Sequence, residues 1–225
     1  MPSKPTTLST AQAEVMLSLQ AGMNARVDSD WIAARYPYLL AVVIEAAEAI
    51  EHHGWKWWKQ QDKDLPQLQM ELIDIWHFIL SELLLNNGGD ELVSRQELTR
   101  LLTQSEDKQI IEFDGRQFEL RQLDLVSKLE LLIGLSAARR IDLAVFASIM
   151  VDCEIEWTEL YCQYVGKNVL NFFRQDHGYK EGSYQKIWQG REDNEYLVEI
   201  LAVLDPAAPD FKDNVYAELT RYYPD

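Results

Sequence analysis

Two pairs of carboxylates, each pair three residues apart, occur within residues 45–76 of the sequence. Glu45 and Glu48 form the first pair, and Glu71 and Asp74 form the second, inside an apolar run. Residues three apart on a helix point in nearly the same direction, so each pair would present two carboxylates to one side. A buried carboxylate without a partner costs several kcal/mol, so the second pair in particular requires a counter-charge.

Two facing helices that each carry such a pair would supply four carboxylates to a divalent cation. Oxygen ligands in that number favour Mg²⁺ or Mn²⁺, whereas Zn²⁺ prefers His and Cys. A solvated face is the ordinary alternative, and it is open for the first pair, because Glu51 and His52 extend a polar stripe there. Apolar residues leave no such face around the second pair. The candidate metal ligands are Glu45, Glu48, Glu71 and Asp74.

A different metal centre is suggested by Asp74 and His77, which form a carboxylate-x-x-His motif. Di-iron helical bundles use that motif on two helices. The sequence has no second carboxylate-x-x-His on an apolar helix. A di-iron centre is therefore disfavoured, and His77 is interpreted as a packed histidine or one that supports the metal ligands.

A cationic segment follows later in the chain. Lys167, Asn171 and Arg174 fall at i, i+4 and i+7 and so share one face of a predicted helix. Gly178 and Gly182 then open a loop with further lysines and tyrosines. In so acidic a chain this segment is typical of an oxyanion site, although a solvated basic face is the alternative.

An amide pair lies near the start of the chain, where Gln20 and Asn24 are four apart on one helical face. Side-chain amides offer both a donor and an acceptor, which suits the edge of uracil, an N–H between two carbonyls. Cytosine presents an acceptor and an amino group there, and unmet buried hydrogen bonds discriminate strongly. The alternative for such a pair is an ordinary surface position.

Composition and charge restrict the possible partners. With 225 residues the chain is expected to form one sizeable domain, or one domain with an appended lobe. Its formal charge of −16 argues against binding nucleic acid, and a polyanionic small substrate would need cations between it and the protein. No apolar run reaches about 18 residues and no signal-peptide pattern is seen, so no membrane span is expected. Cys153 and Cys162 are expected to be ordinary buried residues on one helix. Two such cysteines do not make a disulfide framework, which suits a reducing cytoplasm.

The hydrophobic periodicity predicts an all-α bundle. A β-hairpin is predicted at about 109–120, because Asp114 and Gly115 are typical of a hairpin turn, and we expect it to be a surface appendage. The predicted helices are 9–24 with a cap at Ser9 or Thr10, 29–53 with a break near Pro37, 66–87, 90–105, 121–138, one or two within 141–175, one from about 194, and a short terminal one.

Taken together, these motifs resemble the dimeric all-α dUTPases, within the wider MazG-like all-α NTP pyrophosphatase superfamily. The carboxylate signature belongs to the whole superfamily and does not specify the base, whereas the long C-terminal motif is specific to the dUTPase branch. The resemblance excludes about 88–125, which we interpret as an inserted segment of one domain. The resemblance rests on four stretches of sequence: "LQAGMN" at 19–24, "EAAE" at 45–48, "ELIDIWHF" at 71–78, and "GKNVLNFFRQDHGYKEGSYQKIWQGREDN" at 166–194.

The resemblance implies a homodimer that hydrolyses dUTP, and dUDP, to dUMP with Mg²⁺, for which Mn²⁺ can substitute. It implies that the four carboxylates bind metal and that Gln20 and Asn24 read uracil. Among the four carboxylates, we expect Glu48 to activate the water. A related enzyme acting on dCTP or a damaged nucleotide, and a non-catalytic helical interaction protein, are the alternatives. The residues implied for phosphate are Lys167, Asn171, Arg174, Lys180, Tyr184 and Lys186, and those implied for the nucleoside pocket wall are Trp58, Lys59, His77 and Phe78.

Overall fold

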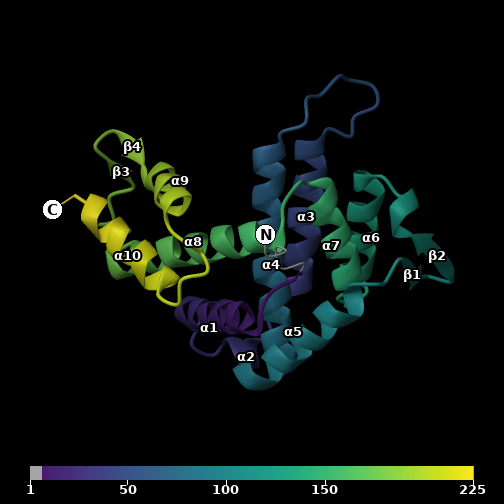
Figure 1. Ribbon diagram of the computed structural model, residues 1–225, viewed down its shortest axis with the longest axis horizontal. Helices are drawn as coiled ribbons and strands as arrows, with labels where there is room; N and C mark the ends of the chain where they lie inside the picture. The colour runs from purple at the N-terminus through teal and green to yellow at the C-terminus, as the bar shows by residue number, and fades with distance from the viewer. Residues whose placement is uncertain (1–6, 225) are drawn as a thin grey trace, which may run out of the picture. The chain divides into compact units, whose positions relative to one another are not determined.

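The structure is a computed structural model that describes residues 7–224. Within them the chain forms ten α-helices and two short antiparallel hairpins, so the prediction of an all-α fold is confirmed (Figure 1). None of the described helices is long and apolar enough to cross a membrane. The chain divides into two compact units, unit 1 up to Trp157 and unit 2 from Thr158, which are described separately.

Unit 1 is built from seven helices, most of which begin at a side-chain cap. Ser9 forms a capping box with Gln12, and aspartates cap the first turns of α4 to α7. The helices are α1 (Thr10–Val27), α2 (Trp31–Ala34), α3 (Tyr38–His53), α4 (Leu65–Asn86), α5 (Glu91–Ser105), α6 (Leu125–Ala137) and α7 (Leu143–Asp152).

The helix pair α3 and α4 forms the centre of unit 1. Pro37 precedes α3, so the predicted break in the second helical stretch is confirmed. α3 ends at Gly54, whose φ of 84° is one that side chains rarely adopt; a Cβ there would also lie 2.9 Å from that of Gln61. The loop 54–64 then projects from the ends of α3 and α4 (Figure 1).

The core of unit 1 lies between α4 and its neighbours. α4 packs against α1, α3 and α5, and α3 packs against α6. The fully buried ring of Trp76 stacks on Phe146 of α7 at 5.3 Å and meets Trp157 edge-on. Its Nε1 also donates to the sulfur of Met16 on α1 at 3.4 Å. These contacts fix the rotation of α4 about its axis, and so the direction in which Glu71 and Asp74 point.

The predicted hairpin is confirmed as β1 (Ile110–Phe113) and β2 (Arg116–Glu119). Asp114 and Gly115 have φ values of 50° and 70°, as a two-residue turn with positive φ at both positions requires. The hairpin is less of an appendage than expected. Ile111 is buried, and the ring of Phe113 occupies the space beside Gly134, where a Cβ would lie 2.9 Å from it.

Unit 2 is held together by aromatic side chains. The rings of Phe173, Trp188 and Tyr223 pack together edge-on, with centroids between 5.3 and 5.9 Å apart. A Cβ on Gly166 would lie 2.6 Å from Leu201, so α8 and α9 approach closely there. The elements are α8 (Trp157–Asp176), β3 (Ile187–Trp188), β4 (Arg191–Glu192), α9 (Asp193–Val203) and α10 (Phe211–Tyr222).

The expectation that the two cysteines share one helix is wrong. Cys153 ends α7 and Cys162 lies within α8, because the chain turns between the two helices. Both are buried, as expected, and burial raises the pKa of each thiol to about 12.

Candidate active site

Three of the four predicted metal ligands meet where α3 packs against α4. One oxygen each of Glu45, Glu71 and Asp74 lies within 4.8 Å of the other two. Glu71 is buried, with 7% of its surface exposed, as the apolar sequence around it requires. In the described part of the chain this is the one cluster of three or more potential ligands, and all its donors are oxygen.

The cluster is electrostatically strained in the absence of a cation. Burial raises the pKa of Glu45 to about 7, and the negative charge of Asp74 and the contact with Glu71 add to the effect. His52 reaches the cluster from α3, because its Nε2 lies 3.3 Å from Glu71 Oε1. The sequence had placed His52 in a solvated stripe, so its approach to the cluster was missed. A cation among these oxygens would favour their ionised forms.

Glu48 stands beside this cluster and is not one of its members. It lies one helical turn beyond Glu45 on α3, its side chain is exposed, and its charge contributes to the raised pKa of Glu45. The four predicted carboxylates thus separate into three that converge and one that faces solvent nearby.

Gln20 and Asn24 face α4 rather than solvent. They are 5% and 6% exposed, so the alternative of a surface pair is wrong. Gln20 Nε2 donates to Asn24 Oδ1 at 3.0 Å, and the Ser81 hydroxyl donates to the same oxygen at 3.1 Å. With that oxygen accepting twice, Asn24 Nδ2 remains a buried donor, and no residue among 7–224 accepts from it.

His77 extends this amide network. Its Nδ1 lies 2.9 Å from Gln20 Oε1. Because the amide nitrogen of Gln20 donates to Asn24, its oxygen is the acceptor in this contact, and the neutral tautomer of His77 that satisfies it carries the proton on Nδ1 and leaves Nε2 as an acceptor. The network therefore offers a donor, Asn24 Nδ2, and an acceptor, His77 Nε2.

The other residues predicted for the nucleoside pocket wall lie around the loop 54–64 and on α4. Trp58 is 56% exposed and meets Trp55 and Trp57 edge-on, and Lys59 is exposed beside it. Phe78 is half-buried on α4, next to His77. The structure does not gather these residues into one wall, and their role stays a prediction.

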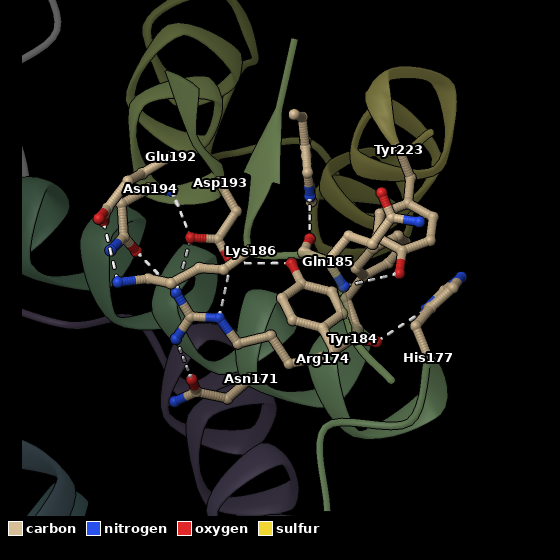
Figure 2. Close-up of polar contacts among 12 residues, drawn as sticks. Asn171, Arg174, His177, Tyr184, Gln185, Lys186, Glu192, Asp193, Asn194 and Tyr223 are labelled. Carbon is tan, nitrogen blue, oxygen red and sulfur yellow. Dashed lines mark hydrogen bonds and ion pairs between the residues drawn. The ribbon is translucent and has the colours of Figure 1, made fainter. Parts of the chain in front are cut away.

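In unit 2, Arg174 is engaged by an acid that the sequence did not single out (Figure 2). Its Nε and Nη2 donate to the two oxygens of Asp193 at 2.8 and 2.9 Å, a bidentate pair. Asn171 accepts from Nη1 at 3.2 Å, and the Tyr184 hydroxyl donates to Asp193 at 2.8 Å. Asp193 is fully buried at the start of α9. Burial alone would raise the pKa of Asp193, but Arg174 and Tyr184 hold it below its ordinary value.

The remaining predicted phosphate ligands differ in their surroundings. Lys186 pairs with Glu192 at 3.0 Å, both side chains being about half exposed. Lys167 is half-buried on α8, and Lys180 is exposed in the loop after it. The six residues therefore lie on α8 and its following loop, and two of them, Arg174 and Tyr184, are held by Asp193.

Comparison with known proteins adds one finding to this geometry. A family model described as dUTPase matches residues 12–179, more than half of the chain. The matched range contains the carboxylate cluster, the amide network and Arg174, and it ends before Asp193. Among curated proteins no match was found.

Proposed function

Since the chain belongs to the dUTPase family and is therefore a dUTP diphosphatase, we propose that it is a magnesium-dependent enzyme that converts dUTP, and also dUDP, to dUMP. The observation that carries the proposal is the all-oxygen cluster of Glu45, Glu71 and Asp74 on α3 and α4, the second of which also contributes His77 and Ser81 to the amide network. Like the family, the chain is proposed to act as a homodimer.

The carboxylate cluster is the proposed magnesium site. Its donors are all carboxylate oxygens, which Mg²⁺ prefers and for which Mn²⁺ can substitute. The raised pKa of Glu45 supports this assignment, because burial first and the neighbouring carboxylates second disfavour its ionised form, and a cation would offset both effects. A bound magnesium ion supplies Lewis-acid polarisation of the phosphate oxygens and offsets the charge of the substrate against a protein of −16.

Glu48 is the proposed general base. Its exposed carboxylate, one turn from the cluster, would take a proton from a water molecule as that water attacks phosphorus. Both cysteine thiols are buried with raised pKa values and are unsuited to act as nucleophiles. The proposed phosphate ligands are Lys167, Asn171, Arg174 and Lys180, with Tyr184 and Lys186 in supporting positions.

The direction of the amide network is the proposed basis for reading uracil. Asn24 Nδ2 would donate to a uracil carbonyl, and His77 Nε2 would accept the N3–H. If every hydrogen bond in the network ran in the opposite direction, Asn24 would present an acceptor and His77 a donor. That pattern would match the base edge of cytosine instead of uracil. Turnover of dUTP, dCTP, dTTP and UTP therefore tests the assignment, and equal rates on dUTP and dCTP would contradict it.

Replacing Asn24 by aspartate is expected to weaken discrimination against dCTP. The variant exchanges the donating amide for an acceptor, so kcat/KM for dUTP should fall by about 10- to 100-fold while that for dCTP falls less. Steady-state kinetics on both nucleotides measure the ratio. Ser81→Ala is the matched control, since it removes a partner of the same oxygen but leaves the donor in place. An unchanged ratio in Asn24→Asp would remove Asn24 from base recognition.

The metal-free protein is expected to lose stability as the pH rises through neutrality. The fold favours the neutral form of Glu45, whose pKa rises from 4.5 to about 7. This contribution is present in full below pH 4.5 and is lost as the pH passes 7. Thermal unfolding in EDTA should show the fall, and Glu45→Gln should flatten it. Added Mg²⁺ should raise the midpoint most at high pH; equal stabilisation at all pH values would contradict the assignment.

A further inference from the structure

Unit 1 contains a cavity bounded by the end of α5, by α6 and α7, and by the residues that follow the hairpin. The cavity has a volume of about 900 Å³. As far as the described residues go, none of those lining it belongs to the carboxylate cluster or to the amide network. Small-molecule sites occupy roughly 300–1,000 Å³, so the cavity is large enough for one.

A buried lysine gives the cavity its chemical character. The Lys128 side chain is only 6% exposed, and its Nζ lies 2.6 Å from Asp152 Oδ2. An ammonium group has three donors, and Asp152 is the one acceptor that residues 7–224 provide for it. Donors left unmet away from water are costly, so this part of the cavity favours a ligand with further acceptors.

The other charges in the lining limit how much negative charge a ligand can carry. Arg121 lines the cavity and, in the described part of the chain, makes no ion pair. Glu106, Glu156 and Lys108 also line it, all three with exposed side chains, and Lys108 pairs with Asp142. Because Asp152 already neutralises Lys128, the lining suits a single negative charge near Lys128 and Arg121 and would repel a polyphosphate.

The remaining wall of the cavity is apolar. Met150 and Ile155 are buried, and Trp157 is half-buried beside them. We propose that this cavity binds a small amphipathic monoanion, a carboxylate carried on an apolar or aromatic body. The carboxylate accepts from Lys128 and Arg121, and the body lies against the apolar wall.

The probe for this site is 4-phenylbutyrate, with 4-phenylbutan-1-ol as its uncharged counterpart. In a ¹H–¹⁵N NMR titration of the full chain, the acid should bind saturably with a Kd of about 1 mM or tighter. The alcohol should bind about tenfold more weakly, because it lacks the charge-assisted hydrogen bonds. Absence of saturable shifts with the acid, or equal affinity for acid and alcohol, overturns the proposal.

Two variants separate a specific site from general surface binding. Ser148→Phe places an aromatic ring in the cavity and leaves the ion pair intact, so it should weaken binding of the acid without altering dUTP turnover. Lys128→Met combined with Asp152→Leu replaces the ion pair by apolar side chains, an exchange that proteins often tolerate. It should lower affinity for the acid toward that for the alcohol, with Arg121 as the one remaining proposed partner of the carboxylate. Thermal unfolding establishes that both variants fold, and wild-type affinity for the acid in both overturns the proposal.

Discussion

Glutamine at position 48 is expected to reduce kcat for dUTP by about 100- to 10,000-fold, the contribution typical of a positioned general base. The amide keeps the size of the side chain but cannot accept a proton from the attacking water. Because Glu48 is exposed and lies outside the carboxylate cluster, the fold and the affinity for Mg²⁺ should persist. Circular dichroism and a Mg²⁺ titration, beside steady-state kinetics, measure all three quantities.

The matched control is Glu51→Gln, one turn further along the same helix. Glu51 is also exposed and is engaged by Lys56 and Trp55, so its loss should change kcat by less than about twofold. Wild-type kcat in Glu48→Gln would remove Glu48 from the role of base. The alternative of a non-catalytic helical protein predicts no Mg²⁺-dependent turnover in any of the three proteins.

The second large effect is expected from Asp193→Ala, which should lower the free energy of unfolding of unit 2 by about 3–5 kcal/mol. The substitution leaves the half-buried guanidinium of Arg174 without its bidentate partner and deprives Tyr184 of its acceptor. Urea denaturation, followed by far-UV circular dichroism, measures the loss. KM for dUTP should also rise, since Arg174 is a proposed phosphate ligand.

Glu199→Gln provides the comparison for Asp193→Ala. Glu199 pairs with Arg191 at 2.7 Å, but both side chains are well exposed, so its loss should cost less than about 1 kcal/mol. Asp193→Asn retains the shape of the side chain and one acceptor, so its loss in the free energy of unfolding should lie between those of Asp193→Ala and Glu199→Gln. If Asp193→Ala were as stable as Glu199→Gln, the buried pair would not be what holds the segment between α8 and α9.

Most of the fold was predictable because its signals are local. Ser9, Pro37, Gly54 and the Asp114-Gly115 turn each mark a boundary through a cap, a missing donor or a positive φ. The shared helix for the two cysteines was a wrong prediction, because an apolar run does not reveal a turn between two buried helices. The docking of the hairpin through Phe113 depends on Gly134, which is distant in the sequence.

The candidate site was predictable only where spacing within one helix carries the chemistry. The separation of three residues predicts that Glu71 and Asp74 share one face of a helix. The same separation between Glu45 and Glu48 does not reveal that Glu48 stays outside the cluster. Asp193 was missed because its partner Arg174 lies 19 residues away, across a loop and a hairpin. The direction of the amide network depends on His77 and Ser81 from another helix, so no local pattern could reveal it.

The most direct test of the central proposal is ³¹P NMR of dUTP incubated with the wild-type chain and with Asp74→Asn, each with Mg²⁺ and with EDTA. We predict that wild-type protein with Mg²⁺ forms dUMP and pyrophosphate, and that EDTA or Asp74→Asn suppresses both products. Undiminished product formation in EDTA, or in Asp74→Asn, would contradict a magnesium site made by Glu45, Glu71 and Asp74.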